Sequence, residues 1–165
     1  MAITIKNIYG IALYSADLPE VGLVLVQALA ASVKLHGANL THLDLRGFDF
    51  GEAQLGGARF WDADLRGANF KNADLHKADF SNANLAQVNF DGADLREARL
   101  DKANLTGASL RSRLAHASFA SADLTLADFG NTALDEVDFT DADLEFVRNF
   151  PGDLRQQIAA RRLEF

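Results

Sequence analysis

A five-residue repeat governs most of this chain, over residues 38–147. It reads Ala-Asp/Asn-Leu/Phe-X-X, as in the unit Ala63–Gly67, and we call the Leu or Phe of each unit its centre. Centres stand at positions 40, 45, 50, 55, 60, 65, 70, 75, 80, 85, 90, 95, 100, 105 and 110, then one residue early at 119, 124, 129, 134, 139 and 144. A fixed period indicates that each unit buries its apolar face only by stacking on its neighbours.

The order of residues within a unit predicts a short strand followed by a turn. A period of five suits neither an α-helix nor a plain alternating strand. The first three residues alternate, so Ala and the centre point the same way. The last two must turn the chain, and the last place is often Gly (47, 57, 67, 92, 107) or Asn (72, 82, 131), which tolerate positive φ. Such a chain winds into a closed coil with a filled interior.

The motif Ala-(Asp/Asn)-(Leu/Phe)-X-X closely resembles that of the pentapeptide-repeat family, over about two thirds of the chain. The resemblance implies a mainly β fold, a right-handed, four-sided β-helix or solenoid with four units per coil. Twenty-two units then make about five and a half coils. At about 4.8 Å per coil, the rod would be roughly 25 Å long.

The placing of Leu and Phe supports four units per coil independently of the resemblance. Centres twenty residues apart would then stack on one side of a prism. One column is all Leu (45, 65, 85, 105, 124, 144), and another is Phe except for Leu110 (50, 70, 90, 129). The column opposite the Phe column is mixed (40, 60, 80, 100, 119, 139), and the last is Leu (55, 75, 95, 134). Stacked aromatic columns favour such sorting. The expected structural centres include Leu65, Phe70, Leu75, Phe80, Leu85 and Phe90.

The repeat loses one residue near position 113. Four residues, Arg113–His116, stand where a five-residue unit should be, yet the columns continue correctly beyond them. We therefore predict a shortened corner at 113–116, with Ala115 as a weak centre.

The segment before the repeat, residues 1–37, predicts a cap for the open first coil. Residues 2–14 read as two short strands about a turn. Residues 18–35 read as a mostly apolar helix that begins with a capping box and stops at Gly37. A cap is expected because an uncovered coil exposes unpaired strand edges.

The segment after the repeat, residues 148–165, predicts a short amphipathic helix. Over residues 153–163, Leu154 and Ile158 share one face. This face is interpreted either as a second cap or as a dimer seam, which some members of the family form at that end.

Composition excludes several classes of function. The chain has no Cys, so it has neither disulfides nor thiolate metal sites and is compatible with a reducing compartment. Its net charge of −7 argues against direct nucleic-acid binding and favours basic partners. The longest apolar run, residues 21–31, is too short to span a membrane and lacks a basic leader, so we expect a cytoplasmic protein.

No catalytic constellation, metal site or cofactor site is predicted. The histidines at 36, 42, 76 and 116 fall far apart in register, and the glycines recur at the turn period rather than in a phosphate loop. Asp or Asn in the second place of the unit is interpreted as a motif position that forms hydrogen bonds and solvates a face.

The outward positions suggest a first candidate surface around Arg59 and Trp61. Arg59, Asp79 and Arg99 would stack one coil apart as an alternating charge ladder. Trp61 lies beside Arg59 in a turn, and Trp and Arg are enriched in binding hot spots. The alternative is a Trp that lies flat over its neighbours.

A second candidate surface is an acidic band between residues 117 and 147, which contain no Lys or Arg. Its acids are Asp123, Asp128, Asp135, Glu136, Asp138, Asp141, Asp143 and Glu145. Leu126 and Phe146 would form an apolar spot within the band. The band is interpreted as a docking surface for a basic protein, or as a surface that the C-terminal helix and its arginines cover.

These features favour a non-enzymatic scaffold for protein–protein interaction, from a bacterium or phage, as a monomer or a C-terminal homodimer. The resemblance raises a second hypothesis, a DNA mimic that binds DNA gyrase or topoisomerase IV and protects it from quinolones. Acidity confined to one end and the lack of long side loops argue against it, although dimerisation would join two acidic bands. A stand-alone structural solenoid without a natural partner is the remaining alternative.

Overall fold

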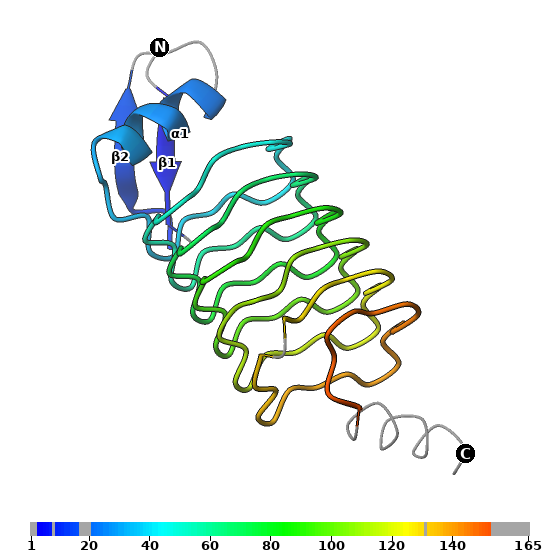
Figure 1. Cartoon of the computed structure of the whole chain (residues 1–165). Helices are drawn as coiled ribbons and strands as arrows, with labels where there is room; N and C mark the ends of the chain where they lie inside the picture. Colours follow the sequence, from blue (N-terminus) through cyan, green and yellow to red (C-terminus); the bar gives the residue numbers. More distant parts are fainter. Residues whose placement is uncertain (1–2, 8, 17–20, 131, 153–165) are drawn as a thin grey trace.

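The computed structural model describes residues 3–7, 9–16, 21–130 and 132–152. A stack of coils forms most of it, with two strands and one helix at its N-terminal end (Figure 1). These elements are β1 (Ile3–Lys6), β2 (Ala12–Ala16) and α1 (Val21–Ala30). Among the residues described, no helix has the length and hydropathy needed to cross a bilayer.

Parallel backbone bridges join each coil to the next. One series runs through Asn39, Arg59 and Asp79, each twenty residues from the one before. The N–H of Phe70 donates to the carbonyl of Asn89 at 2.8 Å, and the N–H of Asn89 donates to the carbonyl of Ala68 at 3.0 Å. Because units pair at a spacing of twenty residues, or nineteen across the shortened corner, the coil contains four units.

Most of the described turns between units hold their third residue in the left-handed region. The N–H of Ala58 donates to the carbonyl of Leu55 at 2.9 Å, and Gly57 between them has φ +66°. The same place is occupied by Lys77 (φ +60°) and Gln87 (φ +59°). This conformation costs an L-residue about 1–2 kcal/mol, which explains why Gly and Asn recur there.

Gly67→Ala should lower the free energy of unfolding by about 1 kcal/mol, because Gly67 has φ +66°. A Cβ at Gly67 meets nothing within 4 Å, so the loss comes from the backbone and not from a clash. Chemical denaturation measures it. Gly67→Asn is the matched control, since Asn72 takes the equivalent place with φ +59°. An equal loss in both variants would contradict the argument.

The interior is filled by the centres and the small residues before them. The centres Leu65, Phe70, Leu75, Phe80, Leu85 and Phe90 are all fully buried. Phe rings stack along one column, with 4.7 Å between the centroids of Phe50 and Phe70. Rings of opposite columns meet edge to face, as Phe70 and Phe80 do at 5.6 Å. The Phe rings therefore form two aromatic clusters, Phe50–Phe90 and Phe119–Phe150, which Leu100 and Leu110 separate.

The centre of the shortened unit is Leu114, and the prediction of Ala115 was wrong. Leu114 is 1% exposed, whereas Ala115 begins the following turn. The N–H of Leu95 donates to the carbonyl of Arg113 at 2.9 Å, which places Leu114 next to Leu95. The Leu column therefore continues without a gap.

The missing residue belongs to the corner at Arg111–Ser112 and not to residues 113–116. Ser112 takes the place of the small inward residue and is 6% exposed. Its N–H donates to the carbonyl of Leu110, two residues earlier, at 2.8 Å. This tighter turn replaces the usual four-residue turn, so the chain stays in register with one residue fewer.

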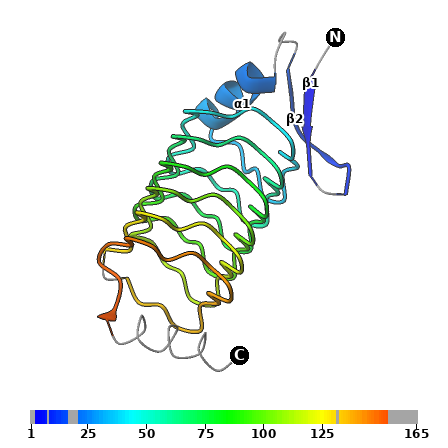
Figure 2. The same cartoon turned by 90° about the vertical axis from the view of Figure 1, so that its right-hand side faces the viewer.

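The helix α1 lies across the end of the first coil (Figure 2). Its Val24, Leu25 and Ala28 are fully buried in the same cluster as the coil residues Leu35 and Leu40. The helix and the solenoid therefore share one hydrophobic core.

The described helix ends at Ala30, before the predicted end at residue 35. Ser32 adopts φ +53°, and its N–H donates to the carbonyl of Leu29 at 2.9 Å. The N–H of Val33 donates to the carbonyl of Ala28 at 3.0 Å. These two bonds form a Schellman motif that closes the helix at Ser32. Gly37, the predicted stop, instead belongs to the first coil and donates to the carbonyl of Gly56 at 2.8 Å.

At the other end, Phe150 packs partly buried against the core. Its ring meets Phe129 and Phe139 edge to face, at 5.2 and 5.4 Å. The predicted helix over 153–163, with Leu154 and Ile158, lies outside the described residues.

Candidate interaction surfaces

The Asp and Asn residues in the second place of each unit bond to the turn that follows. Asp123 Oδ1 accepts the N–H of Thr125 at 3.0 Å, and Asp138 Oδ1 accepts the N–H of Thr140 at 2.9 Å. The carboxylate oxygens satisfy turn N–H groups, which explains the period of these residues. Across the part of the chain that the structure describes, no group of three His, Asp or Glu residues could hold a metal ion.

Several arginines bind the carboxylate of their own unit. Arg66 donates from Nε to Asp64 Oδ1 at 2.9 Å and from its terminal nitrogen to Oδ2 at 2.7 Å. This hydrogen-bonded Arg66 lowers the pKa of Asp64 below its usual value. Arg46 pairs with Asp44 in the same way, one coil away. Both carboxylates are thus already occupied by arginines within the fold.

The predicted ladder of Arg59, Asp79 and Arg99 stacks as expected but does not form its ion pairs. Parallel bridges join Asp79 to both arginines. The carboxylate of Asp79 accepts hydrogen bonds from Ser81, however, and Arg99 pairs with Asp101 at 3.2 Å. Asp79 and Arg99 each interact with a partner in their own unit instead, because that partner lies only two residues away on the same turn.

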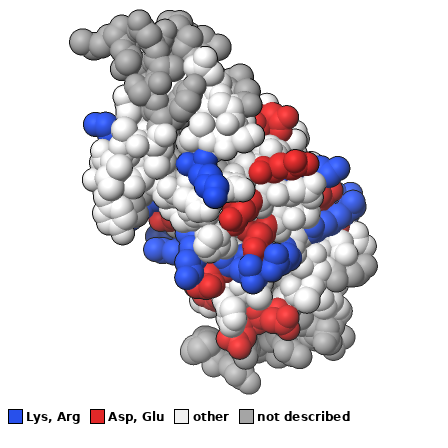
Figure 3. All heavy atoms as spheres, turned by 90° about the vertical axis from the view of Figure 1, so that its left-hand side faces the viewer, with Lys and Arg blue, Asp and Glu red and all other residues white. Residues whose placement is uncertain are grey.

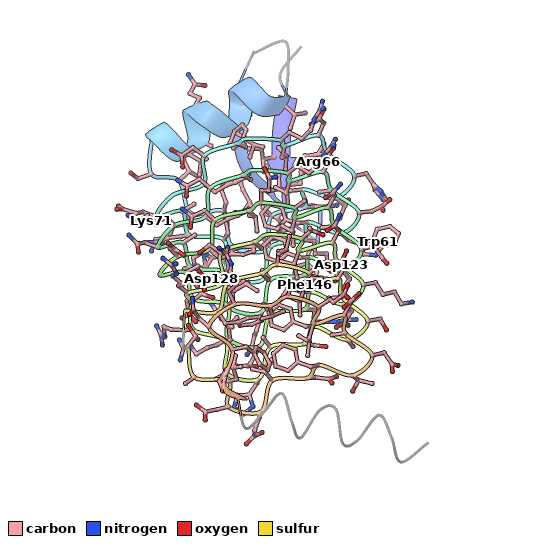
Figure 4. All side chains as sticks on the ribbon, turned by 45° about the vertical axis from the view of Figure 1, so that its right-hand side comes forward. Trp61, Arg66, Lys71, Asp123, Asp128 and Phe146 are labelled. Atoms are coloured by element: carbon pink, nitrogen blue, oxygen red, sulfur yellow. The ribbon has the colours of Figure 1, made fainter. Side chains whose placement is uncertain are left out.

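Trp61 is 42% exposed, and its ring stands against that of His42 at 4.9 Å with an interplanar angle of 81°. The imidazole Nδ1 of His42 lies 3.1 Å from Asp62 Oδ2. The indole meets His42 edge to face, and much of it remains accessible at the flank of the solenoid (Figure 4).

Asp128 is a structural residue and not part of an accessible acidic band. Its side chain is 8% exposed, and Oδ2 accepts a hydrogen bond from Arg111 at 2.7 Å. Its Oδ1 accepts from Asn149 Nδ2 at 2.8 Å and from the N–H of Gly130 at 3.0 Å. The bond from Asn149, followed by those from Arg111 and Gly130, outweighs burial and lowers the pKa of Asp128 to about 2.

Two other acids of the band also have partners. Burial acts to raise the pKa of Asp123, but hydrogen bonds from Thr125 and Thr106 outweigh it and lower the pKa. Glu136 lies 3.2 Å from His116 Nδ1.

The remaining acids are exposed and belong to no ion pair between described residues: Asp135, Asp138, Asp141, Asp143 and Glu145. On the face in Figure 3, Lys and Arg mix with acids over the middle coils, and only acids appear on the described surface nearest the C-terminal end. The acidic band is therefore narrower than the sequence predicted.

Leu126 and Phe146 project outward beside these acids, 48% and 67% exposed. The N–H of Leu126 donates to the carbonyl of Glu145 at 3.1 Å, and Asp123 bridges to Asp143 on the same side of the coil. We call Leu126, Phe146, Asp143 and Glu145 the apolar–acidic patch. Asp123 and Phe146 are labelled in Figure 4.

The fold and these surfaces define a β-solenoid of five-residue units. The sequence model described as pentapeptide repeats (8 copies) matches residues 34–72, 49–87, 73–111 and 112–145. The chain therefore belongs to the pentapeptide-repeat family.

Solved structures with similar folds include other pentapeptide repeat proteins. Rfr23 from the cyanobacterium Cyanothece 51142 is 22% identical, with 75% of this chain and 91% of that chain covered and a TM-score of 0.48. A protein of the Arabidopsis thaliana thylakoid lumen is 33% identical, with 50% and 66% covered and a TM-score of 0.31. QnrB1, a plasmid-mediated fluoroquinolone resistance protein, is 17% identical, with 79% and 90% covered and a TM-score of 0.34. No curated protein matches this chain.

Proposed function

We propose that the protein is a non-enzymatic scaffold for protein–protein interaction. The observation that carries the proposal is the presence of exposed apolar side chains, Trp61, Leu126 and Phe146, at turn positions of a frame whose core is already full. The backbone bridges hold these side chains at fixed coil spacing. Exposed aromatic anchors on a rigid frame are typical of binding surfaces.

The proposal includes finer features that the family resemblance and the sequence suggest. The solenoid is right-handed, has five to six coils, and is capped by α1 over its first coil. The protein acts in the cytoplasm of a bacterium and is encoded either by the bacterium or by a phage. The net charge of −7 favours basic partners.

Affinity capture from an extract of the source organism, followed by quantitative mass spectrometry, tests the scaffold function. We expect specific proteins whose recovery falls at least tenfold when Trp61→Ala, or Leu126→Gly with Phe146→Gly, is introduced. Recovery that no surface variant changes would contradict the proposal.

The exposed acids of the band favour a second candidate, the DNA mimic. The purified protein would then inhibit gyrase supercoiling or protect gyrase from a quinolone. The effect should disappear when Asp135→Asn, Glu136→Gln, Asp138→Asn and Asp141→Asn are combined. No effect of the unmodified protein at tens of micromolar would exclude this function.

We propose a monomer or a homodimer through the C-terminal segment, and light scattering decides between them. A dimer that Leu154→Asp with Ile158→Asp converts to a monomer would support the seam. An unchanged mass with lower stability would support a cap.

A further inference from the structure

The apolar–acidic patch contains bulky side chains where the fold favours Gly or a polar residue. Leu126 and Phe146 adopt φ +62° and +55°. Their column, the last place of the units centred on Leu45, Leu65, Leu85 and Leu105, is otherwise filled by Gly47, Gly67, Gln87 and Gly107. A bulky residue in the left-handed region is unusual and costs about 1–2 kcal/mol. Both side chains are largely exposed, so burial offsets only part of this cost.

The two exposed side chains stand at equivalent turn positions one coil apart, and we call this pair the apolar strip. The hydrogen bond from Leu126 N–H to the carbonyl of Glu145 holds the two turns together at 3.1 Å. Adjacent coils are about 4.8 Å apart, so one apolar side chain of a partner can contact both residues.

On the side of the coil that carries the strip, the charged residues next to it are all acidic. Asp143 and Glu145 are exposed, and no ion pair between described residues includes them. Asp141, also exposed, lies at the preceding turn. Arg148 is the cation nearest along the chain, and it lies beyond the turn, on the next side of the coil. Thus the strip is bordered by carboxylates that lack a described counter-ion.

We propose that the apolar–acidic patch binds a basic amphipathic segment of a partner protein, in which an apolar anchor is flanked by Lys or Arg. The inference rests on the proposed scaffold function and names the partner's chemistry. The anchor would contact Leu126 and Phe146, while the flanking cations would face Asp143 and Glu145. Electrostatic complementarity of this kind accelerates association and excludes acidic partners. A second copy of the same patch is disfavoured, because two acidic surfaces repel each other.

A fluorescein-labelled peptide of about fourteen residues, with Leu at helical spacing and Lys elsewhere, is the probe. Fluorescence anisotropy with the full chain should show saturable binding that weakens as salt rises. Leu126→Gly with Phe146→Gly should weaken binding at least tenfold without loss of stability, since Gly suits the left-handed region. Asp143→Asn with Glu145→Gln should also weaken binding and reduce its salt dependence.

Tyr9→Ala, which removes an exposed aromatic side chain in the N-terminal segment, is the control and should bind the peptide like the unmodified protein. A peptide with Glu in place of Lys should not bind. Equal affinity in all variants, or no binding to the unmodified protein, would overturn the inference. Binding that appears only after Leu154→Asp with Ile158→Asp would assign the patch to residues 153–165 of the chain itself and would also overturn it.

The scaffold function can survive the failure of this inference. Capture from extract that depends on Trp61, and not on Leu126 or Phe146, would support the scaffold while overturning the role of the apolar–acidic patch.

Discussion

Replacing Phe70 by Ala should lower the free energy of unfolding by about 3–5 kcal/mol. Phe70 is fully buried, and its ring stacks on Phe50 at 4.7 Å and on Phe90 at 5.3 Å. It also meets Phe60 and Phe80 edge to face, at 5.5 and 5.6 Å. Removing the ring therefore opens a cavity and breaks four aromatic contacts at once.

The cavity cannot easily collapse, because backbone bridges hold the coils on both sides of Phe70 at fixed spacing. Guanidinium denaturation followed by circular dichroism measures the loss. Trp61→Ala, which removes a partly exposed aromatic ring, should change stability by less than about 1 kcal/mol. A loss below about 1.5 kcal/mol for Phe70→Ala would show that the core repacks.

Asp128→Asn should lower the free energy of unfolding at pH 7 by about 2 kcal/mol. The carboxylate accepts hydrogen bonds from Asn149, Arg111 and Gly130, and its pKa falls from 3.8 to about 2 in the folded protein. A difference of nearly two pKa units corresponds to about 2 kcal/mol. An amide in place of the carboxylate loses the charge and one acceptor oxygen.

The effect of Asp128 has a defined dependence on pH. Since the pKa is lower in the folded state, its contribution is fully present above about pH 4 and is lost as the pH falls through about 2. The difference between the unmodified protein and Asp128→Asn should therefore shrink over this range. Urea denaturation at pH 7, 4, 3 and 2 measures it.

The control for Asp128 is Asp141→Asn, at an exposed turn position with φ +55° that Asn tolerates. We expect a change within about 0.5 kcal/mol at every pH. A deficit of Asp128→Asn that persists undiminished at pH 2, or an equal deficit in both variants, would contradict the assignment of Asp128 as a buried, paired carboxylate.

The stack of coils could be predicted because every unit repeats the same physical requirements. An inward Leu or Phe every five residues and a turn residue that tolerates positive φ are both visible in the sequence. The correct centre, Leu114, was also available, since counting back five residues from Phe119 reaches it. Counting forward from Leu110 leads instead to Ala115, because the missing residue lies between Leu110 and Leu114.

Other features depend on contacts that no local pattern reveals. The Schellman motif at Ser32 uses a residue type that seldom takes the left-handed conformation, so Gly37 was the natural choice for the helix stop. The bonds from Arg111 and Asn149 to Asp128 join residues about one coil away along the chain. Residue types alone therefore could not distinguish this buried carboxylate from the exposed acids around it.

The regular bridges between coils also fix the distance along the axis between exposed side chains. Trp61 and Phe146 stand about four coil steps apart, which corresponds to roughly 19 Å along the axis. Duplication or loss of twenty residues between them would change this separation by about 4.8 Å and leave each residue on its own side of the prism. The distance between two contact points could thus evolve in single steps without redesign of either one.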